Sequence, residues 1–156
     1  MKKIIISLVI IASFVLVACG GGKSDKKAEV EKMLLQGHSW GETENESKSI
    51  GMSNYKFFGL NATSTSKPTQ NSKNQMFEMF YCFSYKDNEI TKSKYRELVK
   101  TFEEELGTKP TEWTKSELTF NDFFVGSLKY TIQYRDCDGT EDYIYIYITN
   151  DKYDAN

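Results

Sequence analysis

The feature that most constrains the fold of this chain is a strict alternation of apolar and polar residues near its C-terminus. Residues 128–136 and 140–149 both alternate in this way, and only Cys137, Asp138 and Gly139 separate them. A period of two is typical of a β-strand with one buried face. Because so short a connection cannot hold a crossover, the two strands are expected to pair as an antiparallel hairpin.

The same pattern favours one register for this hairpin. A two-residue turn at Asp138-Gly139 sets isoleucines opposite polar residues and mixes the two faces. A three-residue loop, with Gly139 in a left-handed conformation, keeps the faces separate. On the apolar face it pairs Ile132 with Ile144, Tyr130 with Ile146 and Leu128 with Ile148. On the other face it pairs Arg135 with Glu141, and it sets Tyr143, Tyr145 and Tyr147 against Gln133, Thr131 and Lys129.

Two further segments show clear periodicity. Residues 76–85 form the most apolar predicted strand, whose one face carries Phe77, Met79, Tyr81, Phe83 and Tyr85. Because its other face is also partly apolar, we expect this strand to be central. Residues 91–106 predict a helix whose apolar stripe recurs at three- and four-residue steps: Tyr95, Leu98, Val99, Phe102 and Leu106. Gly107 and Pro110 are placed to end that helix.

These elements predict an α+β fold, in which one main helix at residues 91–106 packs on an antiparallel sheet of four or five strands. A shorter helix is expected from Ser24 or Asp25 to Gln36, ended by Gly37. Residues 38–54 look irregular, with Trp40 and Ile50 as anchors. We expect a strand at 55–60, a mobile polar loop at 61–75 and another strand near 117–120, and we leave 123–125 unassigned.

The N-terminus predicts export across a membrane. Two lysines, Lys2 and Lys3, precede an apolar run over 4–18 that is shorter than the roughly 20 residues of a spanning helix. The last four residues of this segment, Leu16-Val17-Ala18-Cys19, resemble the lipobox of bacterial lipoprotein precursors. That resemblance implies cleavage before Cys19, attachment of lipid to its thiol, and a place on the extracytoplasmic face of a cell membrane. Two acyl chains would hold such a protein stably.

A second resemblance concerns the C-terminal part of the chain. The sequence Leu106-Gly107-Thr108-Lys109-Pro110-Thr111, followed by Trp113 and the terminal hairpin, is similar to small extracytoplasmic lipoprotein domains of the β-lactamase-inhibitor-like kind. It implies a related fold, and it assigns a role to no residue.

The chain therefore divides into a signal peptide at 1–18, a lipidated flexible tether at 19–24 and one extracytoplasmic α+β domain at 25–156. Its length of 156 residues suits one domain. The formal net charge is −2, and it becomes more negative when Lys2 and Lys3 are removed. This balance disfavours nucleic acid as a partner.

Two of the three cysteines remain once lipid occupies Cys19. In an exported protein, Cys82 and Cys137 are candidates for one disulfide bond. The alternative is that Cys82 is a buried apolar residue and Cys137 a thiol near a turn.

The sequence contains no recognisable catalytic or metal-binding motif. Its one histidine, His38, has no companions that would complete a zinc site or a catalytic triad. The acidic residues Asp136, Asp138, Glu141 and Asp142 surround Gly139, but they do not match the ligand spacing of a calcium loop. We therefore expect no metal and no cofactor, and we regard a small hydrolase that uses two carboxylates as the least favoured reading.

The row Tyr143, Tyr145 and Tyr147 is the remaining candidate for function. Tyrosine offers a large contact area and a hydroxyl at low entropic cost, so such a row suits a partner-binding surface. The alternative is that these residues only satisfy strand propensity. The sequence thus favours a membrane-anchored, non-catalytic binding or inhibitory module that acts on an envelope or surface protein. The main rival is a structural envelope lipoprotein with no discrete ligand.

Overall fold

A computed structural model describes residues 22–43, 56–61, 64–65, 68–85, 87–137 and 140–154. The predicted signal peptide, the lipid-anchor residue Cys19, the anchor Ile50 and the turn residue Gly139 lie outside the described residues.

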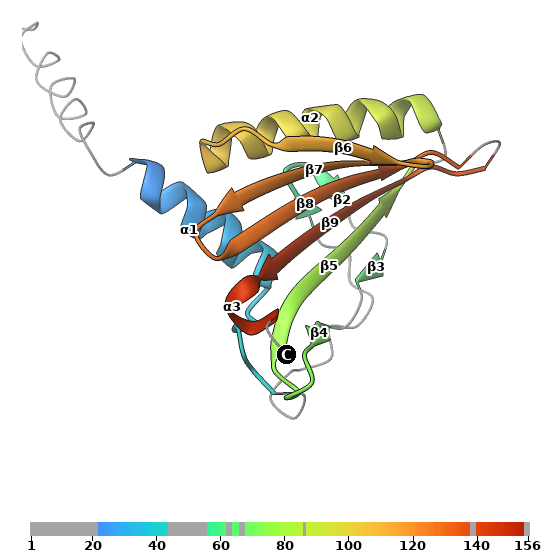
Figure 1. Cartoon of the computed structure of the whole chain (residues 1–156). Coiled ribbons are helices and arrows are strands. Elements are labelled where there is room, and N and C mark those ends of the chain that lie inside the picture. The colour runs from blue at the N-terminus through green and yellow to red at the C-terminus, as the bar shows by residue number, and fades with distance from the viewer. Residues whose placement is uncertain are drawn as a thin grey trace, which may run out of the picture.

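An antiparallel sheet forms the body of the fold, and the α+β class is as expected (Figure 1). Its long strands are β5 (Met76–Ser84), β6 (Thr111–Lys115), β7 (Leu118–Val125), β8 (Leu128–Arg135) and β9 (Tyr143–Asn150). Two short strands, β3 (Ser64–Thr65) and β4 (Thr69–Gln70), both pair with β5. The order across the sheet is β3-β5-β9-β8-β7-β6, with β4 beside β5.

The expected count of four or five strands was too low, because six strands follow one another across the sheet. Two features account for the error. The polar segment 61–75, predicted as a loop, contributes β3 and β4 to an edge, where backbone hydrogen bonds need no apolar side chains. The other edge strand, β6, is exposed at all five positions, so it shows no burial period.

Helix α2 (Asn88–Leu106) packs across one face of the sheet, against β7, β8 and β9 (Figure 1). It begins three residues before the predicted start, because the Asp87 side chain accepts a hydrogen bond from the Ile90 amide at 3.1 Å. Gly107 ends it as expected, with a φ of 61° that favours glycine. Leu98, Phe102 and Leu106 are buried from this helix.

Helix α1 (Gly22–Leu35) lies on the same side of the sheet as α2. Its Leu34 is buried, and the Leu34 carbonyl accepts a hydrogen bond from the hydroxyl of Tyr81 on β5. Because α1 starts at Gly22, residues 22–24 belong to a helix and not to the flexible tether that the sequence suggested.

The terminal hairpin has the predicted faces but not the predicted register. Tyr130 pairs with Ile148 and Ile132 with Ile146, so each residue lies two positions from its expected partner. A slip of two residues keeps every side chain on its face, and therefore the alternation of apolar residues cannot distinguish the two registers. The connection is also longer than expected, since β8 ends at Arg135 and β9 begins at Tyr143.

The segment predicted as a single strand at 55–60 contains a tight turn instead. Strands β1 (Lys56–Phe57) and β2 (Leu60–Asn61) pair with each other around Phe58 and Gly59, which have φ angles of 46° and 79°. Phe58 packs against Phe102 of α2 with ring centroids 5.3 Å apart. The short helix α3 (Asp151–Asp154) follows β9.

Candidate functional site

The face of the sheet opposite α2 carries most of the aromatic side chains that are not in the core. We call it the open face and define it by the row that the strand register sets side by side from β6 to β5: Trp113, Phe120, Gln133, Tyr145 and Cys82. The next row contains Asp122, Thr131, Tyr147 and Phe80. Both long helices pack on the other face.

Trp113 is held in a fixed orientation on this face. Its indole lies flat on the ring of Phe120, with centroids 3.8 Å apart and an interplanar angle of 4°. The indole N–H donates to Asp122 Oδ2 at 2.9 Å. The Trp113 side chain is nevertheless 40% exposed, so it presents a large rigid surface to solvent.

Asp122 connects this tryptophan to the middle of the sheet. Its carboxylate also accepts a hydrogen bond from Thr131 Oγ1 at 2.6 Å and lies 3.3 Å from Lys129 Nζ. Because Asp122 is itself buried, its partners hold it in one position. Thr131 and Lys129 therefore hold the Asp122 carboxylate in place, and this carboxylate orients the indole of Trp113.

The three tyrosines singled out from the sequence lie on the open face, as predicted. Tyr145 lies between Tyr143 and Tyr147, at centroid distances of 6.1 and 6.4 Å. Phe80 of β5 contacts Tyr147 and Tyr145, with centroids 5.1 and 5.6 Å apart. Burial raises the pKa of Tyr147 to about 12, so its hydroxyl keeps its proton at neutral pH and can donate a hydrogen bond.

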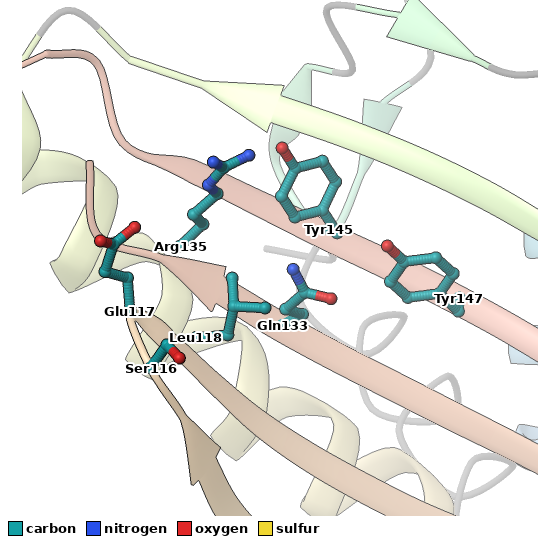
Figure 2. Close-up of a pocket in the computed structure, with 7 residues that line it drawn as sticks. All are labelled: Ser116, Glu117, Leu118, Gln133, Arg135, Tyr145 and Tyr147. Carbon is teal, nitrogen blue, oxygen red and sulfur yellow. The ribbon is translucent and has the colours of Figure 1, made fainter.

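A concavity of about 480 Å³ opens between the tyrosine row and the β6–β7 turn (Figure 2). Gln133 lies at its floor and is 8% exposed, while Arg135 extends along its side. The Arg135 guanidinium hydrogen-bonds to the Tyr145 hydroxyl. Seven residues line the concavity: Ser116, Glu117, Leu118, Gln133, Arg135, Tyr145 and Tyr147.

The disulfide suggested for Cys82 and Cys137 is not formed, and both residues keep a thiol. The strand order explains this result. Cys82 lies on β5 opposite Tyr145 of β9, whereas Cys137 follows the end of β8, so β9 separates the two cysteines. Cys82 is buried, which fits the alternative reading of that residue.

One of the acidic residues after β8, Asp142, has a structural role. Asp142, only 2% exposed, accepts hydrogen bonds from the Tyr134 hydroxyl at 2.5 Å and from the Cys137 amide at 3.0 Å. Asp138 lies outside the described residues. Within the part of the chain that the structure covers, no three His, Cys, Asp or Glu side chains come together as metal ligands. His38 contacts the Glu42 carboxylate.

Sequence reasoning missed Trp113, Asp122 and Arg135 as members of one surface. A signal was present in β7, where Leu118, Phe120, Asp122 and Phe124 recur at period two. This period becomes visible only when residues 118–125 are taken as one strand, and the buried polar residues Asn121 and Asp122 conceal it. The position of Trp113 beside Phe120 depends on β6, whose exposure gives no pattern.

No protein-family model, curated protein or solved structure matches this chain. None of the helices in the described ranges has the length and apolar character needed to cross a bilayer.

Proposed function

We propose that this chain is a lipid-anchored, extracytoplasmic and non-catalytic binding module that recognises another protein through the open face. The observation that carries the proposal is Trp113, which is stacked, hydrogen-bonded and still 40% exposed. A large apolar side chain held in one orientation loses little entropy on binding. Such a residue is a typical anchor of a protein interface.

The composition of the open face supports a protein partner. Binding energy in protein interfaces is concentrated in Trp, Tyr and Arg, and the open face brings together Trp113, Arg135 and the row Tyr143, Tyr145 and Tyr147. Phe124, on the same face of β7, is 57% exposed and extends the apolar area. Standard interfaces bury about 800 Å² on each partner, an area that one face of a sheet this wide can supply.

The proposed anchor sets where the partner is found. The lipobox-like sequence ends at Cys19, and α1 begins at Gly22, so only a few residues separate the proposed lipid from the folded part. Each extended residue spans at most about 3.6 Å, which keeps the domain close to the bilayer. The partner is therefore expected at the membrane surface and not deep in the surrounding envelope.

The proposal is tested by recovery of crosslinked proteins from membranes that contain the full chain. We compare the wild type with Trp113→Ala and with a variant in which Tyr143, Tyr145 and Tyr147 are all alanine. Ile90→Ala is the matched control, because Ile90 is a large apolar residue, 48% exposed, on α2 and away from the open face. Circular dichroism confirms that each variant is folded.

We expect a saturable adduct with one partner in the wild type and in Ile90→Ala, and a loss of that adduct in the open-face variants. Equal recovery from all four proteins contradicts the proposal. A structural lipoprotein with no discrete ligand gives no saturable adduct from any of them.

A further inference from the structure

We propose that the concavity beside Arg135 receives an acidic side chain of the partner protein, whose carboxylate is bound by Arg135 and Gln133. This inference rests on the proposed function, since it gives the chemistry of the partner at the same face. It follows from three properties of the concavity: an amide without a hydrogen-bond partner, a guanidinium without an ion pair, and two cations on the open face beside one lining carboxylate.

The amide belongs to Gln133. This side chain is 8% exposed, and within the described residues it makes no hydrogen bond. Among the described residues, the Tyr130 hydroxyl is the one fully buried polar side-chain atom with no hydrogen-bond partner, so the unpaired Gln133 amide is accessible from the concavity. Figure 2 shows the Gln133 amide directed into the concavity and not toward the backbone beneath it. The site therefore offers an unpaired hydrogen-bond donor to whatever occupies it.

The guanidinium belongs to Arg135. None of the ion pairs among the described residues includes it, whereas Lys129, on the same strand, has Asp122 at 3.3 Å. Arg135 is instead hydrogen-bonded to Tyr145, which holds it at the side of the concavity. Arginine binds carboxylates through two parallel hydrogen bonds in one plane. Among the described residues, Arg135 makes no such pair with a carboxylate.

The charges at this end of the open face also favour an anion. The register places Lys115, Leu118 and Arg135 side by side, so two cations flank one leucine. Glu117, on the β6–β7 turn, is the one acidic residue that lines the concavity. On the open face, two cations thus accompany the one carboxylate that lines the concavity; the other nearby acid, Asp136, follows β8, and its amide donates to the Glu117 carbonyl.

A single carboxylate fits this arrangement better than a phosphate. A phosphorylated residue carries roughly −1.5 to −2 charges and is usually bound by a cluster of arginines. The concavity has one arginine and keeps Glu117 at its rim. Leu118 and the ring of Tyr147 form an apolar surface around it, which can pack against the residues that flank an acidic residue in a folded partner.

Binding of two capped, fluorescein-labelled peptides to the full chain in detergent tests this inference. The probes are acetyl-Tyr-Glu-Tyr-amide and acetyl-Tyr-Gln-Tyr-amide, which differ only in the carboxylate. Fluorescence anisotropy gives the affinity, and the NMR shift of the Gln133 side-chain amide reports where the peptide binds. Lys100→Gln is the control for loss of one positive charge, because Lys100 is exposed on α2.

We expect the Glu peptide to bind about tenfold or more tightly than the Gln peptide, as a hydrogen-bonded charge requires. Arg135→Gln should remove this preference, and Lys100→Gln should preserve it. Glu117→Gln should tighten binding of the Glu peptide a few-fold, because it removes a like charge. Equal affinity for the two peptides, absence of binding by both, or a preference that survives Arg135→Gln overturns the inference.

These outcomes are separable from failure of the proposed function. If Trp113→Ala abolishes the crosslinked adduct while Arg135→Gln leaves it unchanged, the open face binds a protein but the concavity does not hold an acid. If neither variant changes the adduct, the open face itself is not the binding surface.

Discussion

Asp142 holds the connection between β8 and β9, and its removal gives the sharpest stability prediction. Its carboxylate accepts hydrogen bonds from the Tyr134 hydroxyl and the Cys137 amide, at 2.5 and 3.0 Å. Its own amide donates to Asn88 Oδ1 at 3.1 Å, which joins the hairpin to the start of α2. Asn88 Nδ2 in turn donates to the Thr140 carbonyl at 2.8 Å. This network fixes the hairpin register that the apolar pattern leaves open.

Asp142→Ala removes both acceptors and leaves the buried Tyr134 hydroxyl without a partner. A hydrogen bond to a charged group contributes about 1.5–3 kcal/mol, so we expect a loss of about 3–5 kcal/mol in the free energy of unfolding. Asp142→Asn keeps one acceptor and should lose about half as much. A domain of this size has about 5–15 kcal/mol in total, so the larger loss is readily measured.

Urea unfolding followed by circular dichroism measures these changes, and hydrogen exchange of β8 and β9 shows whether the hairpin loosens first. Asp136→Ala is the matched control, because Asp136 is an exposed acid in the same connection. It should stay within about 0.5 kcal/mol of the wild type. An Asp142→Ala loss below about 1 kcal/mol, or one equal to that of the control, refutes the role assigned to Asp142.

Three other substitutions test the core and its titrating groups. Phe102→Ala should cost about 3–5 kcal/mol in urea unfolding, since Phe102 is fully buried. Tyr95→Phe should lower the free energy of unfolding at neutral pH, because it removes the hydroxyl to which Asn121 donates. Burial raises the pKa of Tyr95 to about 12, so the stability of the wild type falls as pH rises from about 10. The difference in free energy of unfolding between wild type and variant should therefore narrow above about pH 10. Burial also raises the pKa of Glu78, so Glu78→Gln should be more stable than wild type at neutral pH, with a difference that shrinks below about pH 4. A constant difference across pH contradicts either titration argument.

The sequence predicts the elements whose apolar period is long and uninterrupted. Helix α2, strand β5 and both faces of the terminal hairpin are found where residues such as Phe102, Tyr81 and Ile146 indicated. Each of these residues is buried by a neighbouring element, and burial is what produces a period. The tyrosine row follows from the same rule, because residues between buried isoleucines must face the other way.

The remaining features depend on contacts between distant segments. The register of β8 and β9 depends on the contact between Asp142 and Asn88, which are far apart in sequence. This contact does not alter which side chains lie on each face of the hairpin, so the apolar pattern does not reveal it. The stacking of Trp113 on Phe120 requires β6 to pair with β7, although β6 buries none of its residues. Neither the register nor this stacking has a local signature, so sequence patterns alone could not predict them.

The most direct test of the central claim is site-specific photocrosslinking in the cells that make this chain. A benzophenone amino acid is placed at Phe124 or Lys115 on the open face, beside the proposed anchors, and at Glu97 or Lys100 on the exposed side of α2. We expect one discrete protein adduct in the membrane fraction from the open-face positions and none from α2. Adducts from α2 alone, or the same adducts from both faces, would contradict it.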